Sequence, residues 1–197
     1  MGLPQRDGAR HTYGEYLTWD DGQRWELIDG VAYAMSPPPT FDHQRVVLEI
    51  AYQLRRALEG KRCEAAIAPI DVRLPKGHER DEDVSDVVQP DVLVVCDPAQ
   101  IDARGVQGAP DFAGEVTSPS TASHDHVRKR RLYERAGVRE LWFVHPVDRH
   151  VTVCRLAEGV YGKPDVRALE GETVVGVLDG VAIQWGPVVA RLAPPPV

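Results

Sequence analysis

The chain has 197 residues, of which 43% are hydrophobic, and its 23 basic and 30 acidic residues give a formal net charge of −7. This length suits one domain with a sizeable apolar core. The acidic balance argues against a surface built for strong nonspecific binding to nucleic acids, but it is compatible with a local basic patch.

The cysteine pattern and the lack of long apolar runs indicate where in the cell the protein is located. Cys63, Cys96 and Cys154 are widely spaced and form no CxxC pair, so neither a disulfide framework nor a zinc site is indicated. Cys96 and Cys154 lie in apolar runs and are expected to be small core residues. The N-terminus lacks a secretory signal, and no apolar run approaches the ~20 residues of a membrane span. We therefore expect a cytoplasmic protein without a membrane partner.

The first half of the chain mixes helix and strand patterns. Apolar residues recur at helical spacing over residues 41–60, and Asp29-Gly30 between two apolar runs is a strong hairpin signal. We expect, in order, a short helix at 12–21, a hairpin at 24–35, a long helix at 41–60, a strand at 63–75, a loop at 76–86 and a strand at 87–97.

The second half continues the alternation. We expect a loop at 102–110, a strand at 111–118, a helix at 121–136 that stops at Gly137, a hairpin at 140–156 and shorter strands to residue 185. The pattern indicates an α/β or α+β fold, a mixed β-sheet flanked by helices with an N-terminal hairpin and additional C-terminal strands. One domain over residues 1–197 is expected, with loose tails at 1–11 and 193–197. Trp142 and Trp185 could belong to a core or to an interface.

Four acids interrupt the apolar runs: Glu26, Asp71, Asp91 and Glu115. Each could be a solvent-facing acid on an edge strand, but a buried carboxylate needs a donor, a cation or a metal. Asp91 opens one strand and Glu115 lies near the end of another, so the two converge if those strands are neighbours. Two converging carboxylates suit Mg²⁺, which can polarise a phosphate and generate hydroxide.

Lys129 is one of only four lysines among the 23 basic residues, and it lies in the arginine-rich stretch "VRKRRLY". A lysine offers a compact charge that can stabilise a phosphoryl group during transfer. Asp125, Lys129 and Tyr133 share one helix face. The alternative is an ordinary exposed Asp125–Lys129 ion pair.

Several segments of the chain resemble a known family. "WELIDG", "SPPPTFDHQRVVLEI", "APIDVRL", "VVQPDVLVV" and "GEVTSPSTASHDHVRKRRLYERAGVRELWFVHP" occur in the order found in the Uma-type restriction endonuclease family of the PD-(D/E)XK nuclease superfamily. The resemblance covers about residues 12–160, the expected nuclease-like core. It implies a restriction-endonuclease-like fold and a Mg²⁺-dependent endonuclease that hydrolyses DNA, with Mn²⁺ able to substitute. We also expect a homodimer.

The resemblance assigns roles to individual residues. Pro90-Asp91 matches the PD of the motif and Glu115 its second acid, which makes Asp91 and Glu115 metal ligands. Thr117 stands where the motif has its lysine. The family has moved this lysine to the following helix, so the resemblance makes Lys129 the catalytic cation.

Further residues carry over with accessory roles. Glu26 matches an upstream acid and is an expected metal ligand, and His43 matches a histidine at the start of the long helix and is a catalytic candidate. Arg128, Arg130 and Arg131 could contact phosphates or form a solvated basic face. His145-Pro146 departs from the aspartate that the family usually has there.

The residues also suggest functions other than DNA cleavage. A transition-metal site built from His124, His126, His145 and His150 is disfavoured, because an H-x-H pair on a helix does not place both rings on one face. No G-x-S-x-G elbow or phosphate-binding glycine loop occurs. The main alternative keeps the nuclease fold without its chemistry, as a binding or regulatory module.

Overall fold

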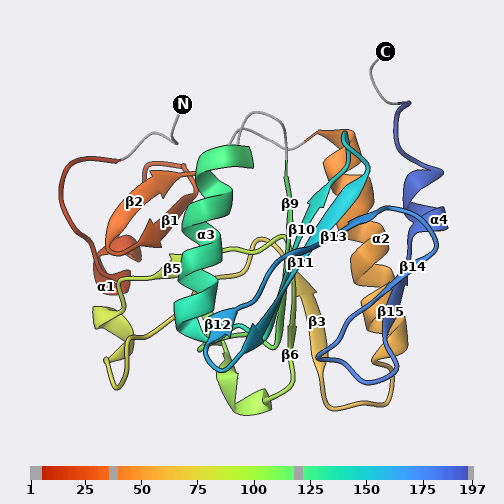
Figure 1. Cartoon of the computed structure of the whole chain (residues 1–197). Helices are drawn as coiled ribbons and strands as arrows, with labels where there is room; N and C mark the ends of the chain where they lie inside the picture. The colour runs from red at the N-terminus through yellow and green to blue at the C-terminus, as the bar shows by residue number, and fades with distance from the viewer. Residues whose placement is uncertain (1–5, 36–39, 118–121, 195–197) are drawn as a thin grey trace.

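A mixed sheet separates the two long helices of the protein (Figure 1). This computed structural model describes residues 6–35, 40–117 and 122–194, with only the backbone of 122–126 described. The first helix, α2, spans Phe41–Ala57, and Thr40 caps it by accepting a hydrogen bond from the His43 N–H at 3.2 Å. The other, α3, spans Ala122–Ala136 and ends, as predicted, at Gly137, whose φ of 89° favours glycine.

The sheet between the helices has the order β12-β11-β10-β9-β6-β3, and β13 pairs with β11. Its strands are β3 (Glu64–Ile67), β6 (Val92–Val95), β9 (Phe112–Val116), β10 (Glu140–His145), β11 (His150–Ala157), β12 (Val160–Tyr161) and β13 (Asp165–Ala168). The pair β9–β10 is parallel and the others are antiparallel. The expected mixed sheet and the adjacency of the two acid-bearing strands are therefore confirmed.

A second sheet, of order β2-β1-β5-β4-β8-β7, carries the N-terminal hairpin. Its strands are β1 (Trp25–Ile28), β2 (Val31–Ala34), β4 (Val72–Arg73), β5 (Val87–Val88), β7 (Ile101–Asp102) and β8 (Gly105–Gln107). Asp29 and Gly30 join β1 to β2 with φ of 52° and 77°, the positive values that a two-residue hairpin turn of type I′ requires.

Short elements complete the chain: α1 (Tyr13–Tyr16), the 3-10 turns η1 (Asp81–Asp83) and η2 (Pro98–Gln100), the strands β14 (Glu172–Val174) and β15 (Ala182–Gln184), and α4 (Trp185–Val189). Segment 6–11, expected to be loose, is tied to the hairpin, because the Arg6 N–H donates to the Ala32 carbonyl at 3.0 Å and the His11 N–H to that of Gly30 at 2.7 Å. Among the described residues, no helix combines the length and the apolar character needed to cross a bilayer.

Two strand predictions and one loop prediction were wrong in the same region. Residues 63–75 and 87–97 were each expected to form one strand, but each splits into two strands that belong to different sheets. The breaks fall at Ala68-Pro69 and at Gln89-Pro90, since proline has no N–H to donate to a sheet ladder. Residues 102–110 were expected to be a loop, yet they include β8, which pairs with β4.

The two faces of the main sheet bury separate apolar clusters. Side chains alternate along β10, so that Trp142 and Val144 pack with α2, whereas Leu141 and Phe143 pack with α3. Trp142 and Trp185 are both fully buried in the cluster on the α2 side, 6.1 Å apart between ring centroids. They therefore belong to the core, and the chain beyond residue 160 contributes to it.

The cysteine prediction was partly wrong. Cys154 is a free, buried core residue as expected, but Cys63 and Cys96 form a disulfide. Glu64 pairs with Val95 across β3 and β6, and the same register continued by one residue sets Cys63 opposite Cys96. Spacing in the sequence carries no information about that register, which is why the pair was missed.

Burial predicts opposite effects for two leucines of α2. Leu54 is fully buried and Leu48 is 62% exposed. Leu54→Ala is expected to lower the free energy of unfolding by about 2–5 kcal/mol through lost contacts and a cavity, whereas Leu48→Ala changes it by about 0.5 kcal/mol or less. Urea denaturation of both variants measures this, and equal losses would contradict the assigned helix face.

Candidate active site

The two acids expected to converge lie opposite each other on neighbouring strands. Val92 of β6 pairs with Gly114 of β9, and the same register continued by one residue sets Asp91 opposite Glu115. The Asp91 Oδ2 atom accepts a hydrogen bond from the Val116 N–H at 2.8 Å. Asp91 is therefore anchored to the backbone of the strand that carries Glu115.

Lys129 of α3 joins Glu115 to an acid from the other sheet. Its Nζ atom lies 2.9 Å from Oε1 of Glu26 and 3.1 Å from both carboxylate oxygens of Glu115. Glu26 and Glu115 are buried, and Lys129 is 12% exposed. The alternative of an ordinary exposed Asp125–Lys129 pair fails for Lys129, while the Asp125 side chain lies outside the described residues.

Two further groups orient the carboxylates. The Tyr133 hydroxyl, one helical turn after Lys129, donates to Oε1 of Glu115 at 2.6 Å, and the Gln89 N–H donates to Oε1 of Glu26 at 3.0 Å. The sequence placed Tyr133 on the helix face of Lys129, but nothing in it indicated this bond. Gln89 was missed, because a backbone donor is independent of residue type.

Burial and charge shift the pKa values of this cluster. Burial, reinforced by the charges of Asp91 and Glu26 and opposed by Lys129, raises the pKa of Glu115 from 4.5 to about 7. Burial alone would lower the pKa of Lys129, but the charges of Glu115 and Glu26 outweigh it and raise that pKa, which keeps the ammonium charged. Burial and the charge of Glu115 also raise the pKa of Tyr133 well above its usual value, so the phenol stays a proton donor.

His43 lies beside Asp91, at the start of α2. Its Nε2 atom is 3.2 Å from Oδ2 of Asp91, the oxygen that also accepts from Val116. The Nδ1 atom is buried without a hydrogen-bond partner in the described part of the chain. His43, expected to be a catalytic candidate, thus contacts Asp91, the acid of the expected PD pair.

The three arginines that flank Lys129 in α3 differ in whether their side chains are free to bind a ligand. Arg130 donates to the Tyr161 carbonyl at 3.1 Å and pairs with Glu134, so it is committed to the fold. The Arg128 guanidinium lies 4.3 Å from the Tyr33 ring centroid, and Tyr33 pairs with Glu26 across the hairpin. Arg131 is exposed. Arg128 can therefore meet a ligand beside the strand that carries Glu26, whereas Arg131, two residues after Lys129, lies on the opposite face of the helix.

The other polar residues singled out from the sequence do not join the cluster of Lys129 and its acids. Asp71 accepts from Gln89 at 2.8 Å and from the Tyr13 and Tyr16 hydroxyls, a structural network. Thr117 contacts His145 at 2.7 Å, and the His145 and His150 rings stack 4.1 Å apart. The side chains of His124 and His126 lie outside the described residues.

The donor set can be compared with the needs of a metal ion. Within the described residues, no group of three or more His, Cys, Asp or Glu side chains could by itself hold a metal. Mg²⁺ does not require such a group, because it commonly takes one or two carboxylates and completes its shell with water and phosphate oxygens. The mutual repulsion of Asp91, Glu26 and Glu115 is also what a divalent cation would relieve. The residues present therefore fit Mg²⁺ better than a transition metal.

A solved structure shares the fold of this protein. The crystal structure of a putative nuclease belonging to DUF820 from Anabaena variabilis matches with a TM-score of 0.71 and 16% sequence identity, over 91% of this chain and 97% of that one. The likeness shows that the chain shares the fold of that protein.

A family model for Uma2, described as "Putative restriction endonuclease", matches residues 13–187. The chain belongs to this family, and the match extends well past residues 12–160, the expected nuclease-like core. An uncharacterized protein of Synechocystis sp., slr1290, is 30% identical over 121 residues, 60% of this chain and 60% of that protein. The match thus spans less than two thirds of the length of this relative.

Removal of the buried cation tests the cluster directly. Lys129→Met leaves Glu26 and Glu115 buried without their counter-charge, a change expected to lower the free energy of unfolding by about 3–5 kcal/mol. Arg131→Met, on the exposed face of the same helix, is expected to change it by about 0.5 kcal/mol or less. Urea denaturation at neutral pH compares the two, and a Lys129→Met protein as stable as the Arg131 variant would refute the buried bridge.

The raised pKa of Glu115 predicts a pH dependence of stability. Between 4.5 and about 7 the folded metal-free protein holds a proton on Glu115 that the unfolded chain has released, so the free energy of unfolding falls as pH rises through this window. Glu115→Gln removes this contribution. Urea denaturation of both proteins in chelator, in steps across the window, checks it, and identical pH slopes would be inconsistent with the raised pKa.

Proposed function

We propose that the protein is a Mg²⁺-dependent endonuclease that hydrolyses phosphodiester bonds in DNA. The observation that carries the proposal is the contact of the Lys129 ammonium with two buried carboxylates, at 2.9 Å from Glu26 and 3.1 Å from Glu115. A fixed cation among converging acids suits phosphoryl chemistry. The family description as a restriction endonuclease supports DNA as the substrate.

Asp91 and Glu115 are the proposed metal ligands, with Glu26 as an accessory ligand. Bound there, Mg²⁺ supplies a Lewis acid for a phosphoryl oxygen and lowers the pKa of a water molecule. Mn²⁺, which also favours carboxylate and water ligands, is proposed to substitute.

The residues around these ligands have separate tasks. Lys129 acts as a permanent cation, because its raised pKa prevents it from serving as a base near neutral pH, and it stabilises the negative charge that develops on the phosphoryl group. Tyr133 and Lys129 both hold Oε1 of Glu115, whereas Oε2 accepts from Lys129 alone among the described side chains and is the oxygen proposed to turn toward the metal ion. His43 positions Asp91 through its contact with Oδ2.

Substrate contacts are proposed for the rim of the site. Arg128 is the candidate for a phosphate of the DNA backbone, whereas Arg130 is committed to bonds within the fold and Arg131 lies on the face of α3 opposite Lys129. Local cations of this kind are compatible with a net charge of −7, because binding then depends on a few phosphate contacts and weakens strongly with salt. A cytoplasmic location and a homodimer remain part of the proposal, and sedimentation measures the latter.

A second candidate function is a catalytically inert module with the same fold. One observation favours it: Lys129 already gives Glu26 and Glu115 a cationic partner in the absence of a metal ion. The two candidates differ in whether Mg²⁺ competes with this internal ion pair.

Metal titration combined with a cleavage assay separates the candidates. Mg²⁺ and Mn²⁺ are titrated calorimetrically into wild type, Asp91→Asn, Glu115→Gln and Lys129→Met, and each protein is incubated with supercoiled plasmid. The acid variants are expected to lose metal binding. Lys129→Met is expected to keep binding and to nick roughly 100- to 1,000-fold more slowly, as for other groups that stabilise transition-state charge.

The control is Glu49→Gln, which changes a buried acid of α2 that contacts Gln53 and Arg191 rather than the site. It is expected to bind metal and nick DNA as wild type does. If wild type binds neither ion and does not nick plasmid, the inert module takes the place of the nuclease.

A further inference from the structure

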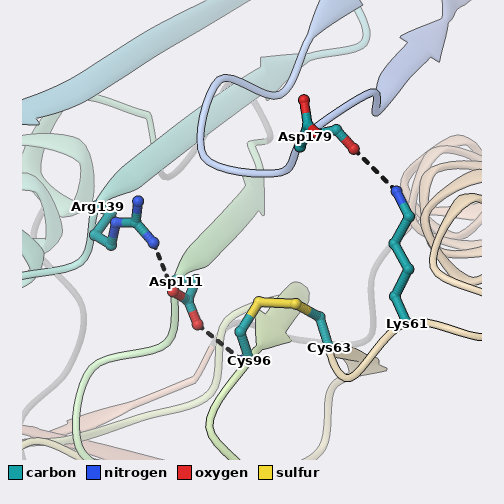
Figure 2. Close-up of a disulfide and its surroundings, with 6 residues drawn as sticks. All are labelled: Lys61, Cys63, Cys96, Asp111, Arg139 and Asp179. Carbon is teal, nitrogen blue, oxygen red and sulfur yellow. Dashed lines mark hydrogen bonds and ion pairs between the residues drawn. A yellow bond between two sulfur atoms is a disulfide. The ribbon is translucent and has the colours of Figure 1, made fainter.

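The two residues of the Cys63–Cys96 disulfide differ in their exposure to solvent. It closes the end of the β3–β6 pair, with the two Cα atoms 3.9 Å apart. Cys96 is 8% exposed, and its N–H donates to Oδ2 of Asp111 at 2.8 Å. Arg139 in turn holds Asp111 at 3.0 Å, as Figure 2 shows. Cys63 is partly buried and, unlike Cys96, lines a pocket, so it is the more accessible of the two cysteines.

A pocket opens at Cys63. It has a volume of about 590 Å³, lies at the C-terminal end of α2 and is lined in part by Arg55, Arg56, Glu59, Cys63 and Glu64. Its size falls in the range of about 300–1,000 Å³ that is usual for sites of small molecules. The disulfide is therefore part of the wall of a cavity that can hold a small molecule.

The charges in this pocket are not used by the fold. Within the described part of the chain, Arg55 and Arg56 have no ion pair or side-chain hydrogen bond, and the same holds for the Glu59 and Glu64 carboxylates. Lys61 nearby differs, since its Nζ atom donates to the Asp179 carbonyl at 2.9 Å (Figure 2). Two free guanidinium groups and two free carboxylates match a ligand that carries both carboxylates and an ammonium group.

We propose that Cys63 is an exchange site for a small amino-acid thiol of the cysteine or glutathione class. The thiolate attacks Sγ of Cys63, the Cys63–Cys96 bond breaks, and Cys96 leaves as a thiolate that takes a proton from water. A second ligand thiolate then attacks the ligand's sulfur in this mixed disulfide. The symmetrical disulfide of the ligand forms, and Cys63 leaves as a thiolate that takes a proton from water. Arg55 and Arg56 bind the ligand carboxylates and favour the attacking thiolate over the thiol.

Exchange at Cys63 removes the covalent link between the edge strand β3 and its neighbour β6 in the main sheet. In the sheet β3 pairs with β6 alone, and the disulfide ties this edge strand and the end of α2 to β6. Reduction removes the cross-link and leaves only the β3–β6 ladder and the packing of β3 against α2. The reduced protein is expected to melt at a lower temperature than the oxidised one.

The test follows exchange by peptide mapping. Oxidised protein is incubated with reduced glutathione or with neutral 2-mercaptoethanol, quenched with acid and digested without reductant. The glutathione adduct is expected on the peptide of Cys63 and not on that of Cys96. Arg55→Gln/Arg56→Gln is expected to slow exchange with glutathione roughly five- to tenfold, as for the loss of two exposed ion pairs, and to leave exchange with 2-mercaptoethanol nearly unchanged.

Arg62→Gln is the matched control, because Arg62 is exposed and adjacent to Cys63 but does not line the pocket. Its exchange rate with glutathione is expected to equal that of wild type. The peptide of the buried Cys154 is followed separately and should stay unmodified. The proposal is overturned if the purified protein has no Cys63–Cys96 disulfide, if the adduct forms on Cys96, or if Arg62→Gln slows exchange as much as the double variant.

Discussion

The buried ion pair of Lys129 with Glu26 and Glu115 is the interaction on which the arrangement of the protein around its candidate site depends. It joins three elements that are far apart in the chain: the N-terminal hairpin, β9 and α3. Each carboxylate alone would be costly to bury, and each is stabilised by the ammonium and by one further donor, the Gln89 N–H for Glu26 and the Tyr133 hydroxyl for Glu115. The same arrangement leaves Asp91 opposite Glu115, so the group that stabilises the junction of the two sheets is also the group suited to phosphodiester chemistry.

Two prolines set up this junction. The chain passes from the main sheet to the second sheet at Pro69 and returns at Pro90, where the missing N–H ends each ladder. The return places Asp91 directly before β6, and Gln89 just outside β5 donates its N–H to Glu26. Pro90 and Asp91 therefore have a structural role. The proline interrupts the chain after β5, and the aspartate directly precedes β6 at the edge where the acids meet.

The opposite end of the same elements carries a different chemistry. His43 and Asp91 meet where α2 and β6 begin, whereas Cys63 and Cys96 follow the far ends of this helix and this strand. The disulfide thus closes the α2–β3–β6 unit away from the candidate site. An exchangeable cross-link at that position would alter the stability of the unit without contact with the metal ligands.

The sequence by itself determined the local elements and the chemical identity of the site. Helical spacing of apolar residues located α2, Asp29-Gly30 located the hairpin turn, and Gly137 located the end of α3, because these signals depend on residues that are near one another in the chain. The resemblance likewise singled out Glu26, Asp91, Glu115 and Lys129, residues that the fold then brings together.

Only the tertiary structure decided how these residues meet. Lys129 and Glu26 are 103 positions apart, and their contact follows from the packing of α3 against both sheets. The splitting of the predicted strands, the Cys63–Cys96 pair and the donation by Tyr133 depend on strand register and on the distance between packed elements. Composition and spacing do not encode these quantities locally, since register and packing are set by the whole folded chain.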